Sequence, residues 1–210
     1  MSQIFDFFLE AYQETPSHLI VLEAIAFLCG ILSVWYAKKA NILVYPTGII
    51  CTVITIYLLF ISEYFGDMMM NFYYSVMSIY GWWNWSRKKN DKYVVPISRT
   101  TTKEKWIGFG FFILTMIVTY SVYLAYDYDL QIPNYIDIVT SGIFFTAMWY
   151  MANKKIENWT LWIIADLITV PLYAHRGLGM LSLQYVVFTI LAIQGYIEWR
   201  KALNKNLQTV

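Results

Sequence analysis

Long apolar stretches separated by short polar segments dominate the pattern of this chain. Seven of them are long enough to cross a hydrocarbon core of about 30 Å, which takes ~20 helical residues. Lipid offers no partner for free backbone N–H and C=O groups, so segments that span it fold as helices. The pattern therefore predicts an all-α membrane protein with seven transmembrane helices, at about 19–37, 42–62, 67–86, 105–126, 134–151, 158–174 and 178–199.

The segment before the first span, MSQIFDFFLEAYQETPSH, is more polar. It has neither a basic N-terminal region nor a small-residue cleavage site, which argues against a secretory signal peptide. We expect a short amphipathic helix that lies on the membrane surface.

Composition excludes several classes of function. Hydrophobic residues make up 59% of the 210 residues and charged residues only 14%, whereas a soluble domain carries about 25% charged residues. A net charge of +1 argues against a nucleic-acid partner. The sequence contains no HExxH motif, no phosphate-binding GxxxxGK[ST] loop and no cluster of Cys and His. We therefore expect neither an enzyme nor a bound metal or cofactor.

The basic residues sort to one side of the membrane when seven spans are assumed. All 15 Lys and Arg residues except Arg176 fall on that side. Because positively charged loops stay in the cytoplasm, the N-terminus is predicted outside and the C-terminus in the cytoplasm.

Residues 35–85 are echoed by residues 149–199. The first copy contains Trp35-Tyr36, Lys38-Lys39, Tyr80-Gly81-Trp82 and Trp85; the second contains Trp149-Tyr150, Lys154-Lys155, Gln194-Gly195-Tyr196 and Trp199. The offset is 114 at both ends, and 117 if Asn41 is matched to Asn158. This pattern indicates a duplicated unit with one small insertion between the copies.

Each copy holds three helices, and a single helix lies between them. The three helices of the first copy and the connector cross the membrane four times, so the second copy starts on the same side as the first. We therefore predict parallel repeats in a 3+1+3 arrangement. The whole chain, 1–210, is then a single transmembrane domain, with repeat one at 19–86, a connector helix at 105–126 and repeat two at 134–199. Parallel repeats place a substrate cavity on an axis along the membrane normal.

Polar and aromatic residues on the sixth span are the first candidates for that cavity. Asn158, Trp162 and Asp166 lie at i, i+4 and i+8 and share one helix face. Asn41 and Tyr45 form a similar pair on the second span. An amide beside an aromatic ring suits a flat, polar heterocycle, which the ring stacks and the amide hydrogen-bonds. Alternatively, the aromatics anchor the helices at the interface and the asparagines cap their starts.

The remaining candidates lie on the other spans of the two repeats: Asn71, Trp149, Gln184 and Gln194. An amide in hydrocarbon needs a partner, so some of them should face the interior. Serines and threonines in the same stripes are equally consistent with close helix packing.

Asp166 is the ionisable group deepest within the spans. A carboxylate at depth costs about 2.5–3.5 kcal/mol on insertion scales, so it should face a cavity or a partner. No Lys, Arg or His shares its level. Transport coupled to protons or sodium would need further ionisable groups at this level, so passive, facilitated transport fits better.

The chain resembles the PnuC-type vitamin transporters, the bacterial nicotinamide riboside permeases, over all seven spans. The most specific matches are Tyr80-Gly81-Trp82-Trp83-Asn84-Trp85, the run from Lys155 to Ile163, and Leu172-Tyr173-Ala174-His175-Arg176-Gly177-Leu178. The resemblance implies a SWEET-like 3+1+3 fold and a homotrimer in the bacterial inner membrane. It also implies facilitated uptake of nicotinamide riboside, which a cytoplasmic kinase traps by phosphorylation. In this family an Asn-xxx-Trp pattern contacts substrate, and Asn158 and Trp162 match it.

Related substrates stay open at this point. Thiamine and riboflavin are carried by relatives of the same family, and a sugar carrier would share the SWEET-like fold. Asp166 bears on this choice because a carboxylate pairs with a cationic ring, which nicotinamide riboside and thiamine both possess. A membrane enzyme or receptor would lack a central site between the repeats.

Overall fold

Seven helices account for almost all of the described structure, a computed structural model that covers residues 16–61, 65–89, 92–93, 95–125, 130–175 and 179–208. The predicted amphipathic helix at the N-terminus, and Arg176, lie outside these ranges. The helices are α2 (Ser17–Lys38), α3 (Val44–Ile61), α4 (Phe65–Ser86), α5 (Thr102–Ala125), α6 (Ile132–Ala152), α7 (Glu157–His175) and α8 (Gly179–Gln208).

Each predicted span coincides with one of these helices, and the all-α fold class is confirmed. Two differences lie at the polar ends. A two-residue antiparallel ribbon, β1 (Lys88–Lys89) with β2 (Lys92–Tyr93), follows α4. In addition, α8 continues to Gln208 instead of ending near residue 199. Residues 200–208 consist mostly of Arg, Lys, Leu, Ala and Gln, which favour helix without needing lipid.

Local signals explain where two of the helices begin. Before α5, the Thr101 hydroxyl accepts the Glu104 N–H at 3.3 Å and the Glu104 carboxylate accepts the Thr101 N–H at 2.8 Å. This reciprocal capping box satisfies donors that a helix start leaves free. The start of α6 repeats the device with Gln131 and Asn134, beside Pro133 in the first turn.

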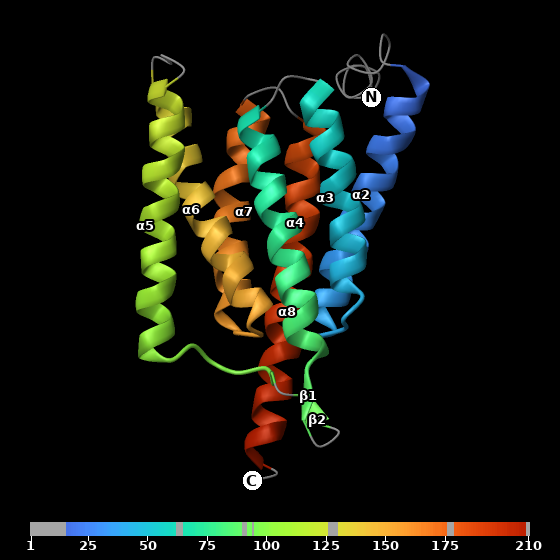
Figure 1. The fold of residues 1–210 in the computed structure, drawn as a ribbon, viewed down its shortest axis with the longest axis vertical. Coiled ribbons are helices and arrows are strands. Elements are labelled where there is room, and N and C mark those ends of the chain that lie inside the picture. Colours follow the sequence, from blue (N-terminus) through green and yellow to red (C-terminus); the bar gives the residue numbers. More distant parts are fainter. Residues whose placement is uncertain are drawn as a thin grey trace.

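The helices alternate in direction, and the two repeats are parallel (Figure 1). Both α2 and α6 run from the end of the bundle near the N label toward the end that carries the C-terminus. Within each repeat, neighbouring helices pack in chain order. Between the repeats, α2 packs on α8 and α4 packs on α6, whereas α5 packs on the outer side of α6. The 3+1+3 arrangement predicted from the sequence is confirmed.

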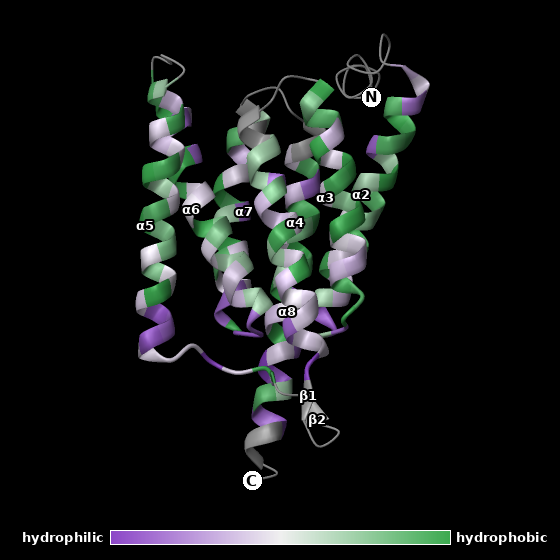
Figure 2. Ribbon diagram, viewed as in Figure 1, coloured by the Kyte–Doolittle hydropathy of each residue, from purple (hydrophilic) through white to green (hydrophobic). Residues whose placement is uncertain are grey.

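Hydrophobic residues cover much of the bundle, and the most hydrophilic ones gather toward the end that carries the C-terminus (Figure 2). Three of the described helices, α2, α3 and α5, are long and apolar enough to cross a membrane by length and composition. Among the other four, α7 carries the inward polar residues Asn158 and Asp166, both almost fully buried. We call the end of the bundle that carries Lys38, Lys154 and Arg200 the basic end.

The repeats match position for position at a constant offset of 114. Ala40 and Lys154 are the two described non-glycine residues with positive φ, at 50° and 52°, in equivalent linkers (154 − 40 = 114). The offset persists inside the helices, where the Thr55 and Thr169 hydroxyls donate to the carbonyls of Cys51 and Ala165, both at 2.8 Å.

The insertion predicted between the copies is therefore absent, and the match of Asn41 to Asn158 is wrong. Asn41 corresponds to Lys155, because the N–H groups of both residues close the same turn at 2.9 Å. Asn158 corresponds to Val44, and Asp166 corresponds to Thr52 rather than to Ile49, the residue that the offset of 117 would match to it. Asn41 and Asn158 have the same side chain, but the backbone hydrogen bonds of the turn show that they are not equivalent positions.

Two tryptophans join the repeats at the basic end through equivalent bonds. The indole N–H of Trp85 on α4 donates to Ala152 O at the end of α6, at 3.2 Å. The indole N–H of Trp199 on α8 donates to Ala37 O and Lys38 O at the end of α2, at 3.0 and 3.1 Å. Each indole thus satisfies a carbonyl that the helix end leaves free. The two rings lie 6.1 Å apart.

A second ring packs edge-on against each tryptophan: Tyr45 against Trp85 at 5.1 Å, and Trp159 against Trp199 at 5.5 Å. All four rings are almost fully buried and belong to one core cluster. We call these four rings the aromatic plug. It closes the basic end of the bundle on the line between the repeats.

Glycines at equivalent positions make room for the plug. A Cβ at Gly81 would lie 2.4 Å from the Tyr45 ring, and one at Gly195 would lie 2.7 Å from the Trp159 ring. Both rings are enclosed by other plug residues, so neither can move aside at low cost.

We predict that Gly195→Ala lowers the stability of the folded bundle by about 1–3 kcal/mol, the usual cost of overpacking a core. Gly110→Ala is the matched control, because a Cβ there would meet nothing within 4 Å. Thermal unfolding of detergent-purified protein measures both. Equal melting temperatures for the two variants would contradict the packing described here.

Candidate functional site

Aromatic side chains from four helices meet between the repeats, farther from the basic end than the plug. We call them the aromatic layer: Tyr73 and Tyr74 of α4, Phe144 and Phe145 of α6, Trp162 of α7 and Tyr185 of α8. Tyr73 stacks on Phe145 with ring centroids 3.8 Å apart, and its hydroxyl donates to Phe145 O at 3.0 Å. This contact joins repeat one to repeat two.

Trp162 lies at the centre of the layer. Its ring is 5.5 Å from Phe144 and 6.3 Å from Tyr74, and Phe144 is in turn 6.0 Å from Tyr185. Trp162 is only half-buried. Its ring face is therefore suited to stack on a flat ligand.

The three candidates on α7 share an inward face, as their spacing predicts. Asn158 is fully buried; its amide N–H donates to Lys155 O at 2.5 Å, and its side-chain oxygen has no hydrogen-bond partner among the described residues. Asp166 is 2% exposed, and its Oδ2 has no partner within the same part of the chain. Buried polar atoms without partners are rare in proteins, so both side chains remain candidates for contact with a ligand.

The candidates on α3 take other roles. Asn41 is exposed, and its side-chain oxygen accepts the Leu43 N–H at 2.9 Å just before α3 begins. That is the capping role held as the alternative in the sequence analysis. Tyr45 is enclosed in the aromatic plug and does not reach the layer.

The last four candidates are spread over the bundle. Gln194 is exposed and accepts a hydrogen bond from Lys38 Nζ at 3.0 Å. Trp149 faces α5, with its ring 5.5 Å from Phe111. Gln184 lies within the repeat interface, where its amide nitrogen is 3.9 Å from the position that a Cβ on Gly30 of α2 would occupy. Asn71 lies one turn from Ser75, whose hydroxyl donates to Asn71 O at 3.1 Å.

The two repeats contribute unequally to the layer. At an offset of 114, repeat one has Gly30 and Gly48 where repeat two has Phe144 and Trp162. At these two positions repeat two therefore supplies a large ring and repeat one carries glycine; the rings that repeat one contributes, Tyr73 and Tyr74, come from α4. This asymmetry follows from the register seen in the structure.

Of the six members of the layer, only Trp162 was among the candidates named from the sequence. The others are Tyr185 and two adjacent pairs, Tyr73-Tyr74 and Phe144-Phe145. A signal was present, since each pair consists of adjacent aromatics near the middle of a span. Adjacent side chains on a helix point about 100° apart, so such a pair can contact two neighbouring helices at once.

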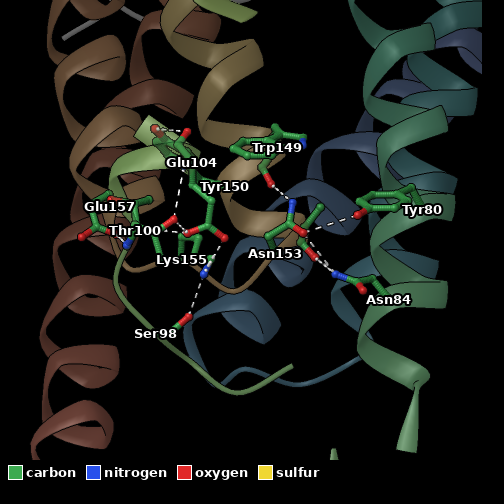
Figure 3. A network of polar contacts seen from close by, with 12 residues as sticks. Tyr80, Asn84, Ser98, Thr100, Glu104, Trp149, Tyr150, Asn153, Lys155 and Glu157 are labelled. Carbon is green, nitrogen blue, oxygen red and sulfur yellow. Dashed lines mark hydrogen bonds and ion pairs between the residues drawn. The ribbon is translucent and has the colours of Figure 1, made fainter. Parts of the chain in front are cut away.

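A polar network fastens the linker before α5 to the turn between α6 and α7 (Figure 3). Ser98 and Lys155 form a parallel β-bridge, and the Lys155 ammonium bonds Ser98 Oγ at 3.1 Å and the Glu104 carboxylate at 2.8 Å. The N–H of Thr100 donates to Glu157 at 3.0 Å. Equivalent contacts from Asn41, the counterpart of Lys155, are not formed in the described part of repeat one, since Asn41 caps α3 instead.

Beside this network lies a polar pocket of about 270 Å³, between α4 and the same linker. Asn84 borders it and donates to Ala152 O at 2.9 Å. Next to it, the Lys154 ammonium lies 4.4 Å from the centroid of the Trp85 ring, and burial lowers the pKa of this lysine from its ordinary value. These groups surround the plug and reinforce closure of the basic end.

Comparison with known proteins gives a family match. The family model described as nicotinamide mononucleotide transporter matches residues 20–201. A nicotinamide riboside transporter PnuC from Escherichia coli K12 is 22% identical over 204 residues, covering 85% of this chain and 84% of that protein. One from Neisseria mucosa is 25% identical, covering 88% and 74%.

Two further similarities bear on substrate and fold. A riboflavin/roseoflavin transporter RibM from Streptomyces davaonensis is 21% identical, covering 90% of this chain and 89% of that protein. The crystal structure of the vitamin B3 transporter PnuC has the same fold, with a TM-score of 0.70 at 23% identity over 88% of this chain and 82% of that one.

We predict that Lys155→Met loosens the linker before α5. A partly exposed ion pair contributes up to about 1 kcal/mol, so trypsin cleavage after Arg99 should accelerate about fivefold. Lys201→Met, outside the network, is the control. Cleavage at the same rate in both variants would show that Lys155 does not hold the linker.

Proposed function

We infer that this chain, which belongs to the nicotinamide mononucleotide transporter family, carries nicotinamide riboside across the membrane. The observation that carries the proposal is the aromatic layer with Trp162 at its centre and Asn158 one turn away on the same helix face. A pyridine ring with an amide substituent is the kind of ligand that an indole stacks and a buried amide recognises.

Transport is proposed to occur by facilitated diffusion. Within the described helices, no Lys, Arg or His lies at the level of the layer, so a proton relay along paired ionisable groups has no partners. Net uptake then requires removal of the substrate inside the cell, and phosphorylation by a cytoplasmic nicotinamide riboside kinase would supply it.

The remaining parts of the proposal follow from charge and resemblance. The basic end faces the cytoplasm under the positive-inside rule, with the N-terminus outside, in the inner membrane of a bacterium. A SWEET-like fold and a homotrimer are proposed from the family resemblance. The aromatic plug is then a closure on the cytoplasmic side of the layer.

Riboflavin is the second candidate substrate, because the Streptomyces davaonensis riboflavin transporter matches the chain over most of its length. Its larger ring system would need more of the layer to move aside than nicotinamide does. Thiamine and a sugar are kept as comparison ligands.

We predict that nicotinamide riboside raises the melting temperature of the detergent-purified protein in a concentration-dependent manner, since a ligand that binds only the folded state stabilises it. Thiamine, riboflavin and glucose form the comparison panel. A shift with one of these and none with nicotinamide riboside would overturn the proposed substrate.

We also predict that Trp162→Ala weakens nicotinamide riboside binding by about 10- to 100-fold, because stacking on an aromatic side chain contributes ~1–3 kcal/mol per base. Asn158→Ala should weaken it through loss of the buried amide. Trp106→Ala is the control, since Trp106 is 70% exposed at the start of α5. Titration calorimetry measures all three, and wild-type affinity in both site variants would return Trp162 and Asn158 to a structural role.

A further inference from the structure

We propose that Asp166 is the counter-charge for a cationic ring and makes the site select charged heterocycles over neutral ones of the same shape. The inference rests on the proposed function, because it assigns one property of the same site. Nicotinamide riboside carries a fixed positive charge on its pyridinium ring, and thiamine carries one on its thiazolium ring.

Asp166 lies on the inward face of α7. It lies one turn beyond Trp162, between Ala165 and Thr169, which are both buried. At 2% exposed and with no hydrogen-bond partner for Oδ2 among the described residues, the carboxyl is desolvated without full compensation. Such a group is costly in a membrane interior unless something else pairs with it.

In repeat one, the position equivalent to Asp166 belongs to a hydrogen-bonded pair that needs no further partner. Thr52 corresponds to Asp166, and its hydroxyl lies 2.6 Å from the Ser75 hydroxyl, with both residues buried. Thr189 corresponds to Ser75, and its hydroxyl donates within α8 to Tyr185 O at 2.8 Å. Repeat one thus has a neutral pair, whereas repeat two has a carboxyl at that depth.

The neighbouring helices offer no cation to pair with it. The two helices packed on α7 are α6 and α8. No Lys, Arg or His occurs in α6, and the first one in α8 is Arg200, beyond Trp199 at the basic end. On α7 itself, His175 is the last residue of the helix, more than two turns from Asp166. The counter-ion is therefore expected from outside the protein.

The substrate is the cation that the site is placed to receive. Trp162 stacks the ring, and Asp166 lies one turn along the same face, about 6 Å farther by helix rise. An indole face and a carboxylate together favour a cationic aromatic ring over a neutral one, since both interactions strengthen with positive charge on the ligand.

The test compares ligands that differ in charge but hardly in shape. Nicotinamide riboside and its reduced form, dihydronicotinamide riboside, share the ribose and the carboxamide, but the reduced ring is neutral. Their affinities are measured for the wild type, for Asp166→Asn and for Asp166→Thr, which introduces the residue of repeat one. Thiamine and riboflavin are measured in parallel.

The expected result is selective. Removing one partner of a buried charge pair should weaken nicotinamide riboside binding about 30-fold in both variants, with the affinity for the neutral form changed less than about threefold. The Thr variant keeps the test decisive if the Asn variant is unstable, because the equivalent Thr is already accommodated at this depth.

Other outcomes overturn one part or the other. Equal losses for the charged and neutral ligands would make Asp166 structural, and so would unchanged binding of nicotinamide riboside. Wild-type binding that requires sodium, with the requirement lost in Asp166→Asn, would make it a coupling-ion site instead. If the wild type binds thiamine but not nicotinamide riboside, and Asp166→Asn weakens thiamine binding, the proposed substrate fails while the role of Asp166 stands.

Discussion

The bundle depends on two equivalent indole bonds at the basic end. Trp85 and Trp199 each reach from the third helix of one repeat to the last carbonyls of the first helix of the other. Because a helix end leaves those carbonyls free, each bond joins the repeats and completes a helix at the same time. The tight packing of Tyr45 and Trp159 against glycines follows from this contact, since the rings need the helices to approach closely.

The same contact underlies the position that we propose for the ligand. With the basic end closed by the plug, the aromatic layer is the next place along the axis where side chains of both repeats meet. The constant offset of 114 then shows where the two repeats differ. Phe144, Trp162 and Asp166 of repeat two occupy the places of two glycines and a threonine in repeat one, and that threonine, Thr52, pairs with Ser75. A duplicated fold thus supplies the frame, and divergence between the copies supplies the chemistry.

Sequence alone predicted the helices and the duplication, because hydropathy and repeated motifs can be read along the chain. It also predicted that Asn158, Trp162 and Asp166 share a face, since helix periodicity determines that. It misjudged the register in the middle of the repeat, where Asn41 matches Asn158 in residue type but corresponds to Lys155 in the turn. Contacts between helices, such as Tyr73 on Phe145 or Gln194 with Lys38, have no local signature and emerge only from packing.

We propose that the substrate lies in the aromatic layer between the repeats, against repeat two. The most direct measurement is an experimental structure of the protein with nicotinamide riboside bound. The expected structure has the pyridinium ring stacked on Trp162, with its charge toward Asp166 and its amide within reach of Asn158. Ligand density in the polar pocket beside Asn84 at the basic end, with the aromatic layer packed as described here, would contradict it.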